Sequence, residues 1–191
     1  TEEIAAINKA IADTAGDTYK RLKEEADQFT EAAKLKTRMA AYGYHSQISA
    51  AVDKEEWLQV DLGESVAISE IRIHPTSDDF NQIGNGFGFP TRFRIECSDD
   101  PTFKESSVVA DQTKFDYPNV GLAFYSSSPE SVAARYVRIT ATKLTARLND
   151  YIMAISEIVV LDEAGQNIAL NKTTSAATSI EQGERWGKQN A

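Results

Sequence analysis

The sequence predicts a mainly β protein: an antiparallel jelly-roll β-sandwich with an N-terminal α-helical extension. Three observations lead to this prediction. Apolar residues recur at every third or fourth position up to about residue 42, and at every second position in the segments after it. These later segments follow one another through turns, with no helical pattern between them, which favours a sandwich or jelly roll. The expected parts are a helical extension over 1–42, a sandwich over 43–165 and a tail over 166–191.

The expected extension contains no proline between residues 2 and 41, and Gly16 is the one glycine there. Its apolar and small side chains form a single stripe, which runs from Ile4 and Ile11 to Leu22 and Phe29. We therefore expect one long amphipathic helix, or two helices broken near Gly16. A packing helix or linker fits this pattern better than a coiled-coil arm, because alanine and tyrosine in the stripe make a poor zipper.

The expected strands each have one apolar and one polar face, as strands of antiparallel sheets do. They are WLQVDLG from Trp57, ISEIRIH from Ile68, TRFRIEC from Thr91, ARYVRITATKL from Ala134 and the more apolar run 152–161. Turn residues separate them at 61–64, 99–101 and 162–165. Two stretches, 75–90 and 113–129, do not fit a strand and are expected to be long loops. Such loops on a rigid sheet often carry binding function.

The composition excludes several classes of protein. The 191 residues include 20 Lys and Arg against 29 Asp and Glu, which gives a net charge of −9. This balance argues against nucleic acid or anionic lipid as a partner, because contacts to phosphate need basic side chains. No apolar run approaches the roughly 18 residues of a membrane span, so no membrane insertion is expected. The single cysteine, Cys97, cannot form an internal disulfide bond.

Five segments in a fixed order carry a family resemblance. They are WLQVDLG (57–63), ISEIRI (68–73), FRIECSDD (93–100), ARYVRI (134–139) and ISEIVV (155–160). Together they resemble the discoidin, or coagulation factor 5/8 type C, family, which includes the family-32 carbohydrate-binding modules of bacterial glycoside hydrolases. The resemblance implies a galactose-binding-like jelly roll whose ligand lies among the loops at one end.

The sequence departs from this family at its two ends. Members open with a strand of the type N-x-A-x-x-K-x-x-x-A-S and a loop of the type A-x-D-G-x-x-x-T-x-W that supplies calcium ligands. Upstream of Trp57 only Ala51-Val52-Asp53 remains of that loop, and the strand-like segment occurs instead at 167–178. This segment either begins a second, tandem module, which we favour, or folds back into the same sandwich. Folding back would bury three apolar side chains, those of Ile168, Leu170 and Trp186.

A sugar-binding site needs an aromatic ring that stacks on the apolar side of a pyranose, and planar or charged groups that hydrogen-bond its hydroxyls. Three groups of residues offer both: 80–89 with Asn81 and Phe89, 147–151 with Asp150, and 42–45 with Tyr42. The candidate ligand-binding residues within these groups are Tyr44, His45, Phe80, Asn85, Phe87, Arg147, Asn149 and Tyr151.

Structural interpretations stand beside the binding ones. Phe87 and Phe89 are at least as well explained as core residues that cap the sandwich. For Tyr151 with Arg147 and Asn149, bracing of the loop is as good an interpretation as binding. Three further residues are assigned structural positions: Trp57, His74 and Cys97.

A metal site or a catalytic site has little support in the sequence. On the resemblance, Glu157 lies where the family often has a calcium-proximal carboxylate, and Asp53 with Glu55 or Glu56 could add oxygen ligands. Because the Asp-Gly loop is missing, we expect no cofactor and do not expect structural calcium. There is also no Gly-x-Ser-x-Gly, His-Glu-x-x-His or phosphate-binding glycine loop, so no enzyme activity is expected.

The sequence therefore predicts a non-catalytic, lectin-like carbohydrate-binding module of a larger secreted bacterial protein, either extracellular or periplasmic. Its expected partners are a glycan and neighbouring domains of the same chain. A piece of a longer protein is expected because the sequence starts at Thr1 without a signal peptide. The alternative is an architectural β-sandwich that packs on neighbouring domains of a multidomain enzyme and binds no ligand of its own.

Overall fold

The structure is a computed structural model in which residues 43–119, 121–181 and 185–191 are described. The predicted helical extension over 1–42 lies outside these residues. The described part is mainly β, and its sheets are antiparallel, as the sequence predicts.

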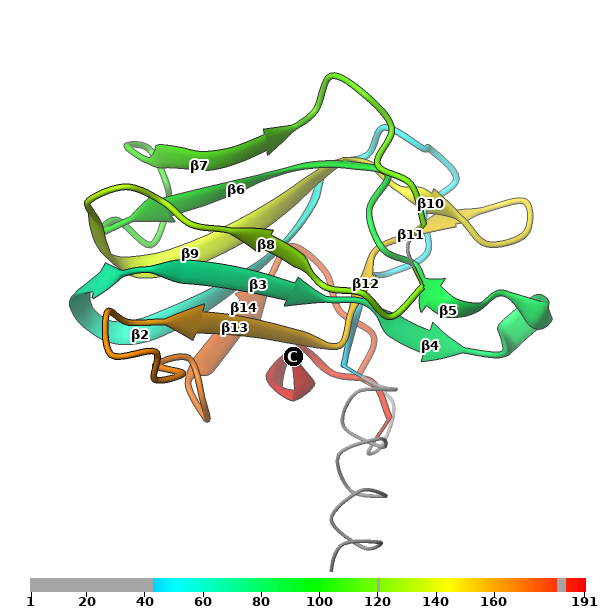
Figure 1. Ribbon diagram of the computed structural model, residues 1–191. Helices are drawn as coiled ribbons and strands as arrows, with labels where there is room; N and C mark the ends of the chain where they lie inside the picture. The colour runs from blue at the N-terminus through cyan, green and yellow to red at the C-terminus, as the bar shows by residue number, and fades with distance from the viewer. Residues whose placement is uncertain (1–42, 120, 182–184) are drawn as a thin grey trace, which may run out of the picture. The chain divides into compact units, whose positions relative to one another are not determined.

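Two sheets form the sandwich (Figure 1). The larger sheet has five strands in the order β14 (Thr173–Ala176), β2 (Glu56–Ile68), β9 (Val132–Lys143), β6 (Arg92–Ser98) and β7 (Ser107–Gln112). The smaller sheet has three strands in the order β13 (Glu157–Leu161), β3 (Glu70–His74) and β8 (Tyr125–Ser127). Apolar side chains from both sheets form one core cluster, so the two sheets pack face to face.

Three short ribbons extend the sandwich at one end. They pair β1 (Tyr44–His45) with β12 (Ala154–Ile155), β10 (Thr145–Ala146) with β11 (Tyr151–Ile152), and β4 (Thr76–Asp78) with β5 (Gly84–Phe87). Two short 3₁₀ turns complete the described elements, η1 (Phe80–Gln82) and η2 (Lys188–Asn190). Figure 1 shows the β4–β5 and β10–β11 hairpins projecting from the same end of the sandwich.

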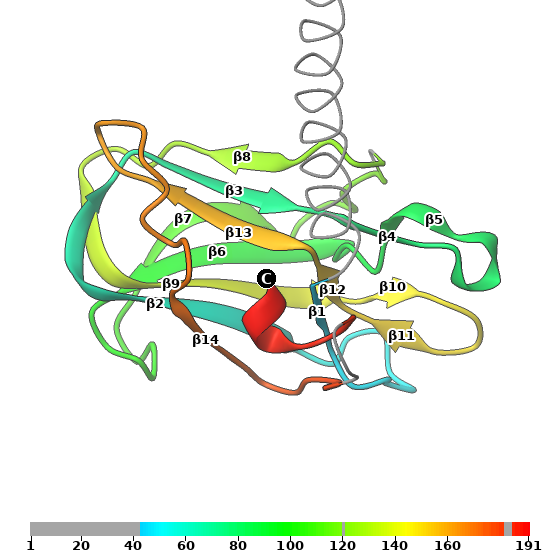
Figure 2. The ribbon, with the colours of Figure 1, turned by 90° about the horizontal axis from the view of Figure 1, so that it is seen from below.

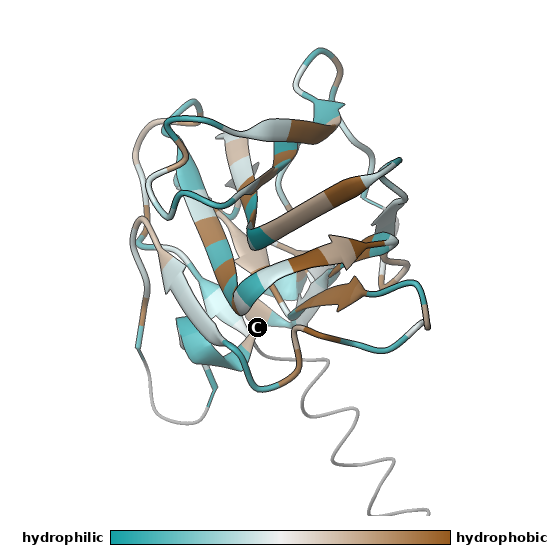
Figure 3. Cartoon of the chain, turned by 90° about the vertical axis from the view of Figure 1, so that its left-hand side faces the viewer, coloured by the Kyte–Doolittle hydropathy of each residue, from teal (hydrophilic) through white to brown (hydrophobic). Residues whose placement is uncertain are grey.

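The alternating segments form strands where they were predicted. In β6, Phe93, Ile95 and Cys97 are buried, while Arg92 and Arg94 are half-buried on the outer face. Figure 3 shows this alternation as brown and teal bands along the strands. Burial raises the pKa of the Cys97 thiol to about 12, which fits the predicted structural position of this residue.

A cluster of aromatic rings in the core surrounds Phe93, whose side chain is 0% exposed. Its ring centroid lies 5.6 Å from that of Phe89, 5.6 Å from that of Tyr117 and 5.0 Å from that of Tyr125, all in edge-to-face geometry. Phe89, Tyr117 and Tyr125 come from the two stretches predicted as loops. These stretches therefore close one side of the core.

The two predicted loops contain more strand than expected. β4 and β5 lie within 75–90, and β8 lies within 113–129. The run 152–161 was expected to be one strand, but it is divided into β11, β12 and β13, which pair with three different partners. These short strands are fixed by their pairing partners, which local alternation does not reveal.

The tail folds back onto the sandwich. Residues 173–176 of β14 pair with Leu58–Asp61 of β2, as Figures 1 and 2 show. Trp186 is 8% exposed and packs in a second apolar cluster with Phe87, Ile152 and Ala154. Ile168 packs against the main core as folding back requires, but Leu170 is 61% exposed, against that expectation. The structure thus has the fold-back arrangement and not the tandem one that we favoured.

Two glycines with positive φ give a matched test of the packing around Gly88. A Cβ added to Gly88, which has φ +67°, would lie 2.7 Å from the Cβ and 2.9 Å from the backbone N of Ala154. A Cβ added to Gly165, which has φ +74°, would meet no atom within 4 Å. Both substitutions carry the backbone penalty, whereas only Gly88→Ala also overpacks the core.

We expect Gly165→Ala to lower the free energy of unfolding by about 1–2 kcal/mol, and Gly88→Ala to lower it by about 1–3 kcal/mol more. Urea unfolding of the two variants, followed by circular dichroism, measures the difference. Equal losses would contradict the close approach of Gly88 to Ala154.

Candidate functional site

The candidate site lies where the tips of two hairpins meet. Phe80 is in η1, between β4 and β5, and its backbone N–H donates to Asp78 Oδ1 at 2.9 Å. Arg147 is in the turn between β10 and β11, which its backbone N–H closes by donating to the Asp150 carbonyl at 2.9 Å. Asn81 Nδ2 lies 3.5 Å from the Arg147 carbonyl and so links the two tips loosely.

The centre of this contact is a ring and a guanidinium group. Arg147 Cζ lies 4.7 Å from the centroid of the Phe80 ring, within the range of a cation–π interaction. The same guanidinium donates from Nε and Nη2 to the two carboxylate oxygens of Asp150, at 3.0 and 2.8 Å. This hydrogen bonding from Arg147 holds the pKa of Asp150 below its usual value. Arg147 is thus fixed and neutralised behind the ring.

The contact leaves apolar and polar groups facing solvent. Phe80 is 42% exposed and Leu148 is 54% exposed. Asn149 lies in the same turn and is exposed, as is Asn81 on the other tip. An exposed ring bordered by amide and carboxylate groups is the combination that a sugar requires. The structure therefore brings together three predicted site residues: Phe80, Arg147 and Asn149.

Two other predicted residues support the frame of this site. Asn85 Oδ1 accepts a hydrogen bond from Ser77 Oγ at 2.8 Å, and the Asn85 carbonyl accepts one from Asn119 Nδ2 at 3.1 Å. Tyr151 is half-buried and packs against the main core, and its backbone exchanges two 2.9 Å hydrogen bonds with Ser49. Tyr151 accordingly braces the β10–β11 hairpin, the structural interpretation that the sequence left open.

Three predicted ligand-binding residues lie in the core instead. Tyr44 is 0%, His45 is 4% and Phe87 is 2% exposed, and this burial excludes contact with a ligand in the observed conformation. The His45 ring packs edge-on against Trp186 at 5.0 Å, and its Nδ1 lies 2.6 Å from the Ser46 carbonyl. Burial lowers the pKa of His45. Trp186 of the returning tail packs against His45 and Phe87, and the Phe87 ring in turn lies edge-on to the Phe80 ring, with the centroids 6.5 Å apart.

The two predicted metal ligands lie on separate elements. Asp53 is in an exposed turn, and Glu157 is exposed on β13 opposite His74 of β3. Within the described ranges, no three His, Cys, Asp or Glu side chains come together as metal ligands. Glu56 is fully buried, its Oε1 lies 2.5 Å from Lys54 Nζ, and its Oε2 accepts a 2.8 Å hydrogen bond from Thr178 Oγ1. The carboxylate of Glu56 therefore ties β2 to the tail.

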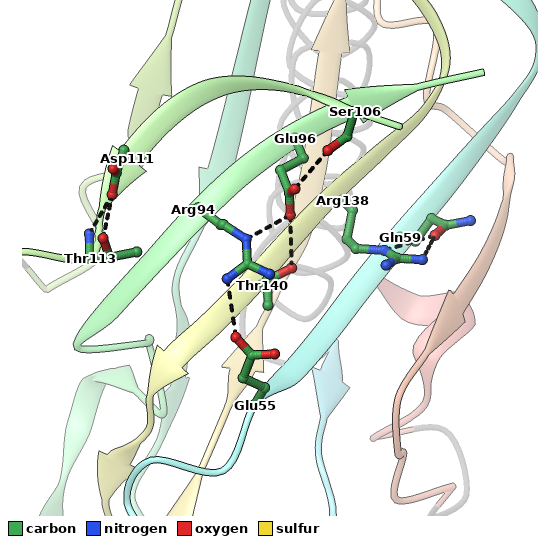
Figure 4. Close-up of polar contacts among 9 residues, drawn as sticks. All are labelled: Glu55, Gln59, Arg94, Glu96, Ser106, Asp111, Thr113, Arg138 and Thr140. Carbon is green, nitrogen blue, oxygen red and sulfur yellow. Dashed lines mark hydrogen bonds and ion pairs between the residues drawn. The ribbon is translucent and has the colours of Figure 1, made fainter. Parts of the chain in front are cut away.

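The sequence analysis missed a second polar group, on the outer face of the five-stranded sheet (Figure 4). At its centre Glu96 is 8% exposed and accepts hydrogen bonds from Arg94 Nε and Ser106 Oγ, both at 2.9 Å. Beside it, Arg138 Nε donates to Gln59 Oε1 at 3.0 Å. The polar positions of the alternating segments contained this signal, but they were interpreted only as solvated faces.

A family model agrees with this fold. The family model described as F5/8 type C domain matches residues 16–158. A comparison with curated proteins finds no match. Among solved structures, the chain is similar to module CpGH89CBM32-5 from Clostridium perfringens, in complex with GalNAc-beta-1,3-galactose, at 17% identity and TM-score 0.43. This likeness covers 56% of this chain and 66% of that one.

Two further similar structures are also isolated modules of bacterial enzymes. One is CBM32-3 from a family 31 glycoside hydrolase of Clostridium perfringens, at 21% identity and TM-score 0.46, covering 61% of this chain and 72% of that one. The other is chitosan-binding module 1 from a chitosanase/glucanase of Paenibacillus sp. IK-5, at 18% identity and TM-score 0.43. It covers 59% of this chain and 73% of that one.

Proposed function

The chain belongs to the F5/8 type C domain family, and on this premise we propose that it is a non-catalytic carbohydrate-binding module with its site at the two hairpin tips. The observation that carries the proposal is the partly exposed ring of Phe80, held from one side by Arg147. A pyranose stacks on such a ring through its C–H groups. Asn81 beside Phe80, and Asn149 and Asp150 in the turn of Arg147, offer hydrogen bonds to hydroxyl groups.

The charge of the site favours a neutral glycan. The guanidinium of Arg147 is already paired with the Asp150 carboxylate through two hydrogen bonds, so it offers little to a second anion. The chain as a whole carries a net charge of −9, which disfavours a polyanionic polysaccharide. Neutral hexose and N-acetylhexosamine polysaccharides are therefore the first ligands to test.

The module acts, in this proposal, within a larger secreted bacterial protein, in the extracellular space or periplasm. It holds a glycan so that a neighbouring domain works close to it. Affinity is modest, because one shallow site at two loop tips buries little area. No helix in the described ranges is long and apolar enough to cross a membrane.

Phe80→Ala is expected to weaken glycan binding by about tenfold or more, because the variant loses the stacking surface. Stability changes by about 1 kcal/mol, since Phe80 is 42% exposed and its ring contacts are those with Arg147 and, edge-on at 6.5 Å, with Phe87. A glycan array on the whole chain identifies the ligand, and isothermal titration calorimetry with that ligand measures the loss.

Phe115→Ala is the matched control, because Phe115 is 81% exposed and lies in a different loop. This variant should bind as the wild type does. Equal weakening by both substitutions would place the site elsewhere. A folded wild-type chain that binds no plant, algal or host polysaccharide would contradict the proposal and favour the architectural alternative.

A further inference from the structure

We propose that the outer face of the five-stranded sheet holds a second binding site, in which Arg138 binds a single acidic group, a carboxylate or a sulfate ester, carried by a sugar. This site goes beyond the proposed function and uses none of the residues at the hairpin tips. The inference rests on the position of Arg138, on its aromatic neighbours and on the lack of an ion pair to it among the described residues.

Arg138 lies in the middle of a transverse row of outward-facing residues. Successive strands of the sheet place five residues opposite one another: Ser175, Gln59, Arg138, Glu96 and Val108. The residues before and after Arg138 on β9, Val137 and Ile139, are 0% exposed, so Arg138 lies on the opposite, outer face. Figure 4 shows its side chain lying across the sheet toward Gln59. The row thus places a half-buried cation at the centre of the outer face of the sheet.

Two aromatic rings flank the Arg138 guanidinium. Arg138 Cζ lies 4.3 Å from the centroid of the Trp57 ring and 3.9 Å from that of the Phe103 ring. Phe103 has a φ of +55°, a backbone conformation that is strained for a bulky residue. A turn that begins at Asp100 fixes this backbone conformation, because the Asp100 carbonyl accepts a hydrogen bond from the Phe103 N–H at 3.0 Å. The strained turn thus places the Phe103 ring over the Arg138 guanidinium.

Arg138 forms no ion pair with a carboxylate of the described residues. Five other arginines each form an ion pair with a carboxylate: Arg72, Arg92, Arg94, Arg135 and Arg147. In the described part of the chain, Arg138 donates only to neutral acceptors. These are Gln59 Oε1, from Nε at 3.0 Å and Nη2 at 2.6 Å, and the Pro101 carbonyl, from Nη2 at 3.2 Å. Partial burial lowers the pKa of Arg138.

The free donors define the ligand. A guanidinium has five N–H groups, and the three hydrogen bonds above leave the two on Nη1 without a partner among the described residues. These two N–H groups diverge from one nitrogen, so each can donate one charge-assisted hydrogen bond, for which an oxyanion is a stronger acceptor than a neutral oxygen. The nearest acid in the row, Glu96, already accepts from Arg94, Ser106 and Thr140, so it does not fill this position.

The surroundings limit the ligand to one acidic group. Asp100 and Glu96 lie near enough to interact electrostatically with Arg138, and the net charge is −9, so a polyanion would be repelled. A sugar with one acidic substituent gains the Arg138 contact with much less repulsion than a polyanion. The chemistry shared by a uronate carboxylate and a sulfate ester is an oxyanion on a hydroxylated ring.

The test is an NMR titration of the whole chain with three sugars that differ only at C6: glucose, glucuronate and glucose 6-sulfate. The Trp57 indole N–H reports on the site, and the indole of Trp186, 8% exposed in the second apolar cluster, is the internal reference. We expect a saturable shift of Trp57 with an acidic sugar and none with glucose. The acidic sugar that gives the tighter binding identifies whether carboxylate or sulfate is the natural group.

Arg138→Gln should weaken this binding at least about tenfold, because it removes the charged donors. The matched control is Arg92→Gln, which removes one positive charge from β6 on the same outer face of the sheet. Arg92, unlike Arg138, is paired with a carboxylate, that of Asp116. Control affinity should stay within about twofold of wild type. Arg138→Lys is the variant to use if Arg138→Gln fails to fold. It keeps the charge but loses the planar guanidinium near the Trp57 and Phe103 rings, and it should also weaken binding.

Absence of a Trp57 shift with both acidic sugars would overturn the proposal, and so would equal weakening by Arg92→Gln. The result is independent of the hairpin-tip site, because Phe80→Ala should leave this titration unchanged. Failure here and failure of the proposed function are therefore distinguishable.

Discussion

A chain that ends at Gly165 is expected to lose cooperative unfolding at 25 °C. The missing residues include β14, which supplies the strand beside Leu58–Asp61 of β2. They also include Trp186, which is 8% exposed, and Thr178, whose hydroxyl hydrogen-bonds the fully buried carboxylate of Glu56. These elements lie beyond residue 158, where the family match ends. The structure makes them part of the same folding unit.

A single substitution shows how much of this effect comes from one side chain. Trp186→Ala should lower the free energy of unfolding by about 3–5 kcal/mol, the range for removing a buried aromatic side chain. Domains of this size are stabilised by about 5–15 kcal/mol in total, so this loss combined with that of β14 leaves little stability. Urea unfolding of the truncated chain and of Trp186→Ala, followed by circular dichroism and tryptophan fluorescence, measures both effects.

Leu170→Ala is the control in the same segment, because Leu170 is 61% exposed. It should change stability by no more than about 0.5 kcal/mol. If the truncated chain unfolds at the urea concentration of the full chain, the tail is an appendage, and the tandem interpretation of its sequence is correct.

Phe93→Ala is expected to be the most destabilising substitution within the main core, at about 3–5 kcal/mol. Phe93 is 0% exposed, and three aromatic rings surround it. Removing its ring leaves a cavity and also takes away the support of Phe89 and Tyr117, which join the predicted loops to the sandwich. Chemical denaturation, with the slope checked for two-state behaviour, measures the loss.

Two further variants test whether the loss in Phe93→Ala comes from the cavity that it leaves in the core. Phe93→Leu keeps most of the apolar volume and should lose clearly less than Phe93→Ala. Phe115→Ala removes the same atoms from an 81% exposed side chain and should change stability by no more than about 0.5 kcal/mol. A loss in Phe93→Ala no greater than that of Phe115→Ala would show that the aromatic cluster does not hold the loops.

The part of the fold that the sequence predicted is the part fixed by local pattern. β2, β6 and β9 are long, and each alternates over enough residues to define its buried face. β8 has three residues, and it forms because Ile71–Ile73 of β3 lie beside it. A strand of that length carries no alternation of its own, so only the neighbouring strand identifies it.

The residues predicted for the candidate site also fall into those that local sequence places correctly and those that it does not. Phe80 and Arg147 belong to hairpin tips, which turn residues indicate, and their residue types alone suggested sugar binding. Tyr44 and His45 have the same types, but they lie beneath a tail that returns from about 140 residues away, with Trp186 against His45. Sequence spacing cannot report that contact. The role of Phe80 and Arg147 in binding remains a prediction for the calorimetry to decide.

The fold-back strand also has a consequence for solubility at high concentration. β2 is 13 residues long, and without β14 its outer edge would present unpaired N–H and C=O groups over Leu58–Asp61. Such an edge is a template for pairing with a strand of another molecule. The four residues of β14 occupy it with a short strand whose exposed positions are the polar Thr173 and Ser175. The tail thus protects the sheet against edge-to-edge aggregation.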